Sequence, residues 1–272
     1  MRYWIDVYRA NLRLAWSAMV QYRFVVLIWA LWGFVGPLIS LAVWTAATAA
    51  RGSAVTTGSG AAFGRADFAA YFLTFMIIGH ITMSWDAFQF AYEVRSGSLS
   101  ARLLKPLHPI HTDASQNISF KLFTTLLLLP IWALLFVLLL PTPPASWTQL
   151  LLAVPAVLLA AVLRYVWQYA LAALAFWTTR VDAVNQLYYT LDSFLSGRIA
   201  PLVLLPGWLG VMAAWSPFRG MGAFPVELAL GRMPPAQILP GFAQQVAWLA
   251  VGILVFRAVW AAGIKQYSAV GA

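Results

Sequence analysis

The chain contains no cysteine and few charged residues, and both shortages limit what it can be. Without cysteine it has no disulfide, zinc–thiolate site, iron–sulfur cluster or cysteine nucleophile. Charged residues make up 9% of the 272 positions, against about 25% in an ordinary soluble protein. A soluble chain with so few charges would expose apolar patches that drive association. Because 62% of the residues are hydrophobic, the composition predicts an integral membrane protein.

Sequence motifs of catalysis are also missing. The lysines are Lys105, Lys121 and Lys265, and none follows a glycine, so the chain has no P-loop for ATP. It contains neither H-E-x-x-H nor G-x-S-x-G. We therefore predict no catalytic residue and no enzymatic activity in this chain.

A metal site has weak support in the sequence. His108 and His111 lie close to Asp113, but Pro109 argues against a regular helix between the two histidines. Zinc needs three or four placed ligands, and a further ligand is not evident. We interpret this stretch as a surface loop and expect no bound metal.

The net charge of +9 does not indicate nucleic-acid binding. The basic residues flank the long apolar runs, and no basic patch is interleaved with exposed aromatics. Lys and Arg gather at alternate connections, as the positive-inside bias predicts for cytoplasmic loops. This asymmetry places both termini in the cytoplasm and makes membrane lipid the surrounding partner.

Apolar runs recur along the whole chain, which is predicted to form a single transmembrane domain, 1–272. An interfacial helix is predicted over 1–23, because basic and apolar residues alternate there at helical spacing. Stretches long enough to cross a bilayer follow; they are 24–46, 68–90, 118–140, 149–179, 183–204 and 242–264. Residues 205–240 are interrupted by Pro and Gly and suit a re-entrant hairpin, since irregular backbone cannot face lipid. The predicted fold class is an all-α membrane protein with six transmembrane helices.

The connection at 91–117, after the second predicted span, has a short amphipathic pattern. Leu99, Leu103, Leu104 and Leu107 form an apolar stripe with basic residues beside it. Two interpretations suit this pattern equally: a helix lying on lipid headgroups, or a docking helix for a soluble partner.

Ionisable residues within spans are functional candidates, because a charge in hydrocarbon is costly. Arg164 lies in the fourth predicted span, and Asp192 and Arg198 lie in the fifth. We hypothesise that Asp192 pairs with Arg164 or Arg198, and a structural ion pair is favoured over substrate contact because burial demands pairing in any case. His80 and Asp86 in the second span are weaker candidates, and His80 suits a polar contact between helices.

The order of these features resembles a permease subunit of the ABC-2 class of ATP-binding-cassette transporters. The resemblance covers nearly the whole chain and rests on loose motifs in a fixed order. They are the N-terminal interfacial helix, the six spans, Arg95-x-Gly97-x-Leu99-x-x-x-Leu103-Leu104-x-Pro106, the broken stretch before the last span, and the ending from Lys265 to Ala272.

The resemblance implies a transporter half that lacks its own ATPase. The connection after the second span would be the coupling helix, with Leu99, Leu103 and Leu104 as anchors on the ATPase and Arg95 and Arg102 as polar contacts. ATP and Mg would bind two copies of a cytoplasmic ABC ATPase, not this chain. A second permease, identical or paralogous, would complete the transporter in the inner (plasma) membrane of a bacterium. Export is the default direction.

Two other functions remain as alternatives. One is a secondary transporter working without an ATPase, but such folds show broken helices in both halves, and the sequence indicates a break only in the second half. The other is a membrane-embedded scaffold or enzyme, for which no catalytic pattern is found. The abundant aromatics suit a lipophilic or cationic cargo, either drug-like or lipid-linked, but they also suit interfacial belts.

Overall fold

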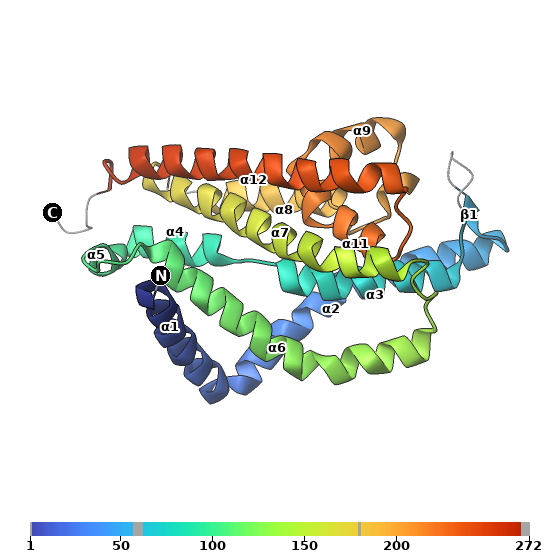
Figure 1. The fold of residues 1–272 in the computed structure, drawn as a ribbon, viewed down its shortest axis with the longest axis horizontal. Helices are drawn as coiled ribbons and strands as arrows, with labels where there is room; N and C mark the ends of the chain where they lie inside the picture. Colours follow the sequence, from blue (N-terminus) through green and yellow to red (C-terminus); the bar gives the residue numbers. More distant parts are fainter. Residues whose placement is uncertain (1, 57–61, 179–180, 268–272) are drawn as a thin grey trace.

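The computed structural model describes residues 2–56, 62–178 and 181–267 of the chain. Over these ranges the protein is almost entirely helical, as predicted, and the helices run roughly along one long axis (Figure 1). Five of its helical segments are long and apolar enough to cross a membrane. They are α2 (Arg23–Arg51), α3 with α4 (Arg65–Thr82 and Asp86–Ser96), α6 (Pro109–Leu139), α7 with η1 (Trp147–Ala172 and Ala173–Phe176) and α12 (Pro235–Gly263).

The predicted fifth span, 183–204, is shorter than a membrane crossing. It forms α8 (Val181–Leu195), which has 15 residues, whereas a span needs about 20. The helix stops because Gly197 takes a left-handed conformation (φ 86°), and its carbonyl accepts a hydrogen bond from Tyr71 Oη at 2.9 Å. A Cβ at Gly197 would collide with that hydroxyl, so the turn requires glycine. The count of six long spans is therefore not confirmed.

The chain still returns to the end of the bundle where α3 begins before its last helix starts (Figure 1). The turn η2 (Leu202–Leu204) and the short helices α9 (Gly207–Trp215), α10 (Pro217–Met221) and α11 (Ala223–Ala229) complete the path that α8 leaves unfinished (Figure 1). Helix α11 is almost wholly buried, so other helices cover this broken backbone. Helix α12 begins at Pro235, earlier than the predicted span, and ends beside α5 (Leu99–Leu103) (Figure 1).

The predicted second span is also interrupted. Met83, Ser84 and Trp85 are non-helical, and they separate α3 from α4. Ser84 Oγ donates to Asp86 Oδ2 at 2.5 Å, a local bond that competes with the helical ladder. Tyr189 Oη donates to the Ser84 carbonyl at 3.1 Å and satisfies backbone freed by the break. The expectation that only the second half of the chain is broken is thus wrong.

The connection 91–117 is shorter than the sequence suggests, because α6 already begins at Pro109. Proline is tolerated at the first helical position, because a backbone N–H there would have no acceptor within the helix. His108 caps the helix by accepting a hydrogen bond from the Ile110 amide at 3.2 Å. The interpretation of Pro109 as a sign of loop structure is therefore wrong.

The N-terminal helix α1 (Arg2–Gln21) packs along α6, at the same end of the molecule as α5 (Figure 1). Tyr8 Oη lies 2.8 Å from His111 Nδ1, and Trp16 stacks edge-on against Phe123. At the opposite end, β1 (Val55–Thr56) and β2 (Ala62–Phe63) form a small antiparallel hairpin within the predicted loop. The α5 end of the molecule, which contains α5, therefore lies opposite the hairpin end, which contains β1 and β2 (Figure 1).

Candidate functional site

The short helix α5 projects from the α5 end of the molecule after Gly97, whose left-handed conformation (φ 75°) turns the chain out of α4. The leucines of the predicted stripe do not share one environment. Leu99 is fully buried in this chain's own core, Leu103 is half-buried against it, and Leu104 is 88% exposed. A partner can therefore reach Leu104 in this conformation, whereas the predicted anchor at Leu99 is covered.

Arg102 fixes α5 to the transmembrane helices. Its guanidinium makes ion pairs of 2.5 Å with Glu93 on α4 and 2.5 Å with Asp113 on α6. It also donates to the Pro109 carbonyl at 3.0 Å, and Tyr169 Oη on α7 donates to the other Asp113 oxygen at 2.8 Å. Burial would lower the pKa of Arg102, but the two carboxylates outweigh it and raise the pKa above its ordinary value.

The predicted partner contact at Arg102 is thus engaged inside the chain. Glu93 and Asp113 were not predicted as the partners of Arg102. Their signal was available, because the chain has only eight acidic residues and these two flank Arg102. Arg95, the other predicted polar contact, lies 3.6 Å from Asp182 on α8.

The segment after α12 also contacts α5. Tyr267 Oη donates to the Gly97 carbonyl at 3.1 Å and shares a hydrogen bond of 2.9 Å with Ser100 Oγ. The rest of the predicted ending motif, 268–272, lies outside the described residues. Pro106, like Lys105, is exposed beyond α5. Segment 97–108 is therefore bound to several long helices, while Leu104, Lys105 and Pro106 at its tip stay exposed.

A second polar group lies within the helical bundle. Asp192 Oδ2 is 2.8 Å from Arg164 Nη1 and 3.3 Å from Arg198 Nη2, so the carboxylate pairs with both arginines. Arg164 also donates to the Met221 carbonyl at 3.3 Å. Asp192 and Arg164 are buried, whereas the Arg198 side chain is 29% exposed. We refer to Arg164, Asp192 and Arg198 as the charge triad.

The remaining intramembrane candidates lie near the interruption of the second span. His80 Nε2 is 2.9 Å from Thr124 Oγ1 on α6, a contact between two helices. Asp86 accepts hydrogen bonds from Ser84 and, at 3.1 Å, from Asn117 Nδ2. The residues of the described ranges contain no group of three or more His, Asp or Glu arranged to hold a metal ion.

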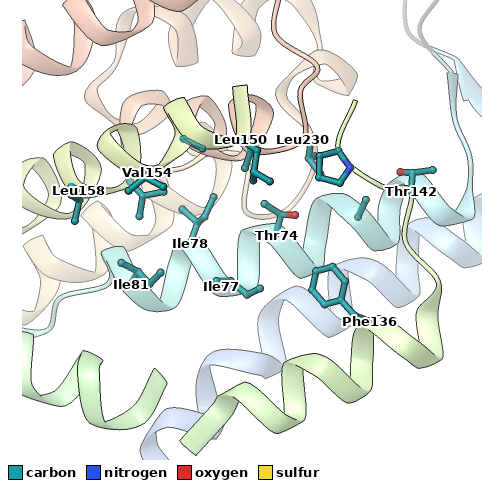
Figure 2. Close-up of a pocket in the computed structure, with 15 residues that line it drawn as sticks. Thr74, Ile77, Ile78, Ile81, Phe136, Thr142, Leu150, Val154, Leu158 and Leu230 are labelled. Carbon is teal, nitrogen blue, oxygen red and sulfur yellow. The ribbon is translucent and has the colours of Figure 1, made fainter. Parts of the chain in front are cut away.

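Two cavities among the helices differ in chemistry. One has a volume of about 500 Å³ and lies between α3, α6 and α7, where Figure 2 shows side chains such as Ile78, Phe136 and Val154 around it. Only Thr74 and Thr142 contribute hydroxyls to its walls. The other, about 250 Å³, lies between α2 and α3 and is lined by both His80 and Arg198. The first suits hydrocarbon, and the second offers charge.

The comparisons with known proteins agree with this architecture. No curated protein sequence matches the chain. A family model described as "ABC-2 family transporter protein" matches residues 61–271, from the hairpin to the C-terminal tail, and so covers most of the chain. Its long apolar helices make it a multi-pass membrane protein. The chain therefore belongs to the ABC-2 transporter family, as a membrane-spanning permease subunit.

Proposed function

We propose that this permease is the membrane half of an ATP-driven exporter in the plasma membrane, coupled through segment 97–108 to two cytoplasmic ABC ATPase subunits. ATP and Mg would bind those ATPases. Both termini of the permease would be cytoplasmic, and a second permease, identical or paralogous, would complete the transporter.

The observation that carries this proposal is the combination of an exposed tip and an anchored base in one short helix. Leu104 projects at 88% exposure, and Lys105 and Pro106 beside it are also exposed. Arg102 joins the same segment to α4 and α6 through charged hydrogen bonds, which are stronger and more directional than neutral ones. A movement imposed on the tip would therefore be transmitted to the membrane helices.

The experiment is purification of the tagged, full-length chain from its native membranes in mild detergent, followed by identification of co-purifying P-loop ATPases. Leu104→Glu places a charge at the exposed apolar tip. We expect it to lower ATPase recovery about tenfold or more, as loss of an interface hot spot does. The matched control is Leu140→Glu, because Leu140 is 74% exposed at the hairpin end of α6. This substitution should leave ATPase recovery unchanged.

Two outcomes would overturn the proposal. One is that no P-loop ATPase accompanies the wild-type chain. The other is transport by the reconstituted chain alone that does not respond to ATP. If Leu104→Glu instead weakens the contact of segment 97–108 with lipid vesicles and leaves ATPase recovery unchanged, segment 97–108 is an interfacial helix on lipid headgroups.

The secondary-transporter alternative gains one observation from the structure. Helices α3/α4 and α8 are both interrupted, so each half of the chain contains a discontinuous helix. Discontinuous helices line substrate sites in secondary transporters. Membership of the ABC-2 family favours the ATP-driven mechanism, and ATP-independent transport is the result that would reverse this preference.

The exposed apolar face of α2 supports the proposal of a second permease. Ile28, Trp29 and Trp32 are 68%, 67% and 73% exposed on this helix. Such a surface contacts either lipid or another membrane helix. Native mass spectrometry of the detergent-solubilised complex distinguishes one permease copy from two, and identifies a paralogue by its mass.

A further inference from the structure

The charge triad contains an excess of positive charge. Asp192 is the one carboxylate that pairs with Arg164 and Arg198 across the described residues, so two positive groups share one negative group. The triad thus carries one more positive than negative charge, and an unbalanced charge in a medium of low dielectric constant is costly.

Arg198 is the member of the triad that faces open space. Arg164 is enclosed, and it is also held by the Met221 carbonyl. Arg198 has the longer ion pair, 3.3 Å, and its side chain lines the cavity of about 250 Å³ between α2 and α3. Its buried Nε has no hydrogen-bond acceptor among the described residues. A guanidinium offers donors in a planar fork that matches a carboxylate or a phosphate.

The rest of this cavity is apolar or aromatic and contains no acid in its described lining. Its walls include Trp32, Pro37 and Phe75, and His80 beside them is engaged with Thr124. Gly33 and Gly36 also line the cavity, and a Cβ at either would meet no atom within 4 Å. The cavity therefore has a single cationic end, at Arg198, and mostly apolar walls.

We infer that this cavity binds an acidic amphiphile, through a carboxylate or phosphate held by Arg198 and an apolar body against α2 and α3. The inference rests on the proposed transport function; it keeps the lipophilic character of the expected lipophilic or cationic cargo and replaces the cationic group with an acidic one. The ligand's charge completes the neutralisation that Asp192 alone leaves unfinished.

The test compares dodecyl phosphate with dodecylamine, two probes that share one alkyl chain and differ in the sign of their head group. Each is titrated into the purified full-length chain in a neutral detergent, and binding is measured as the rise in thermal unfolding temperature. We expect dodecyl phosphate to stabilise the wild type and dodecylamine to have no effect. Arg198→Gln should weaken phosphate binding about tenfold to a hundredfold, since it removes a hydrogen bond with charge on both partners.

Matched variants separate binding from folding. Gly36→Leu fills the cavity from α2 and should abolish the response, whereas Gly210→Leu, also facing open space but on α9, should retain it. Arg51→Gln removes an exposed arginine at the C-terminal end of α2 and should leave the stabilisation by dodecyl phosphate unchanged. Equal stabilisation by both probes, or an undiminished response in Arg198→Gln or Gly36→Leu, would overturn the inference.

The source of the acidic group is distinguished by reconstitution. If it is a resident membrane lipid, phosphatidylglycerol co-purifies with the wild type and less so with Arg198→Gln, and nanodiscs of phosphatidylglycerol abolish the response to dodecyl phosphate. If it is cargo, the response persists in those nanodiscs. This binding assay involves no ATPase, so its failure leaves the coupling proposal standing, and absence of an ATPase partner leaves the binding result standing.

Discussion

Replacing Asp192 with asparagine tests whether the charge triad holds the bundle together. The substitution keeps the shape of the side chain and removes the carboxylate that lies 2.8 Å from Arg164 and 3.3 Å from Arg198. Asp192 is 0% and Arg164 2% exposed, so water cannot take over the lost interaction without opening the bundle.

The expected effect is large. Removing one partner of a buried ion pair destabilises a protein by about 3–5 kcal/mol, because the other charge stays buried without compensation. At about 2–4 °C per kcal/mol for a chain of this size, the thermal midpoint should fall by roughly 6–20 °C. Asp182→Asn is the control, since its carboxylate is 61% exposed and its pair with Arg95 spans 3.6 Å. An exposed pair of this kind contributes about 1 kcal/mol or less.

The assay is thermal unfolding of the purified chain in one detergent, followed by intrinsic fluorescence and by the loss of monodisperse protein. A double-mutant cycle with Arg164→Met and Asp192→Leu then measures the coupling between the two side chains. We expect the double variant to be more stable than the sum of the single losses predicts, because removal of both charges leaves fewer unpaired groups. Additive losses, or an Asp192→Asn midpoint equal to that of Asp182→Asn, would refute the structural role of the triad.

Three further predictions concern other parts of the molecule. Arg102→Met should lower stability by about 3 kcal/mol, because it leaves the largely buried Glu93 and Asp113 carboxylates without their cation; an unchanged unfolding midpoint would contradict the anchoring of α5. Gly241→Ala should destabilise the chain, because its Cβ would collide with the Phe224 ring, whereas Gly210→Ala meets nothing and should be neutral or stabilising by up to ~1 kcal/mol; circular dichroism melts compare the two. Burial, with smaller contributions from the neighbouring His111 and Arg102 charges, lowers the pKa of His108 below its ordinary 6.5. Folding therefore opposes protonation of His108. The free energy of unfolding should be constant above about pH 6.5 and fall as the pH drops below that value. His108→Asn keeps an N-cap residue and should flatten that pH dependence in melts between pH 8 and 5.

Much of the fold could be predicted because bilayer insertion depends on local composition. The run from Phe24 to Ala46 is long and uncharged, and the structure makes it part of α2. The Pro- and Gly-rich stretch 205–240 likewise forms the short helices α9, α10 and α11 before α12 begins at Pro235. Both signals are sums over neighbouring residues, and a sequence displays them directly.

The breaks within apolar runs could not be predicted in the same way. Residues 183–204 and 68–90 are each long enough for a span, yet helix α8 ends just before Gly197 and the second span breaks at Ser84. Each break is stabilised by a tyrosine from elsewhere in the chain: Tyr71 at Gly197 and Tyr189 at Ser84. A local pattern contains no information about such distant donors.

The same division, between local pattern and distant contact, applies to the candidate sites. By itself, the sequence determined a helical membrane protein and marked Arg164, Asp192 and Arg198 as unusual, because charge is rare within an apolar span. Arg102 was a candidate only as a partner contact implied by the family resemblance. Only the tertiary structure decided that Arg102 faces inward to Glu93 and Asp113, that Asp192 serves two arginines, and that Arg198 borders a cavity. Composition sets the cost of a buried charge, but the packing of helices distant in the sequence determines which partner offsets it.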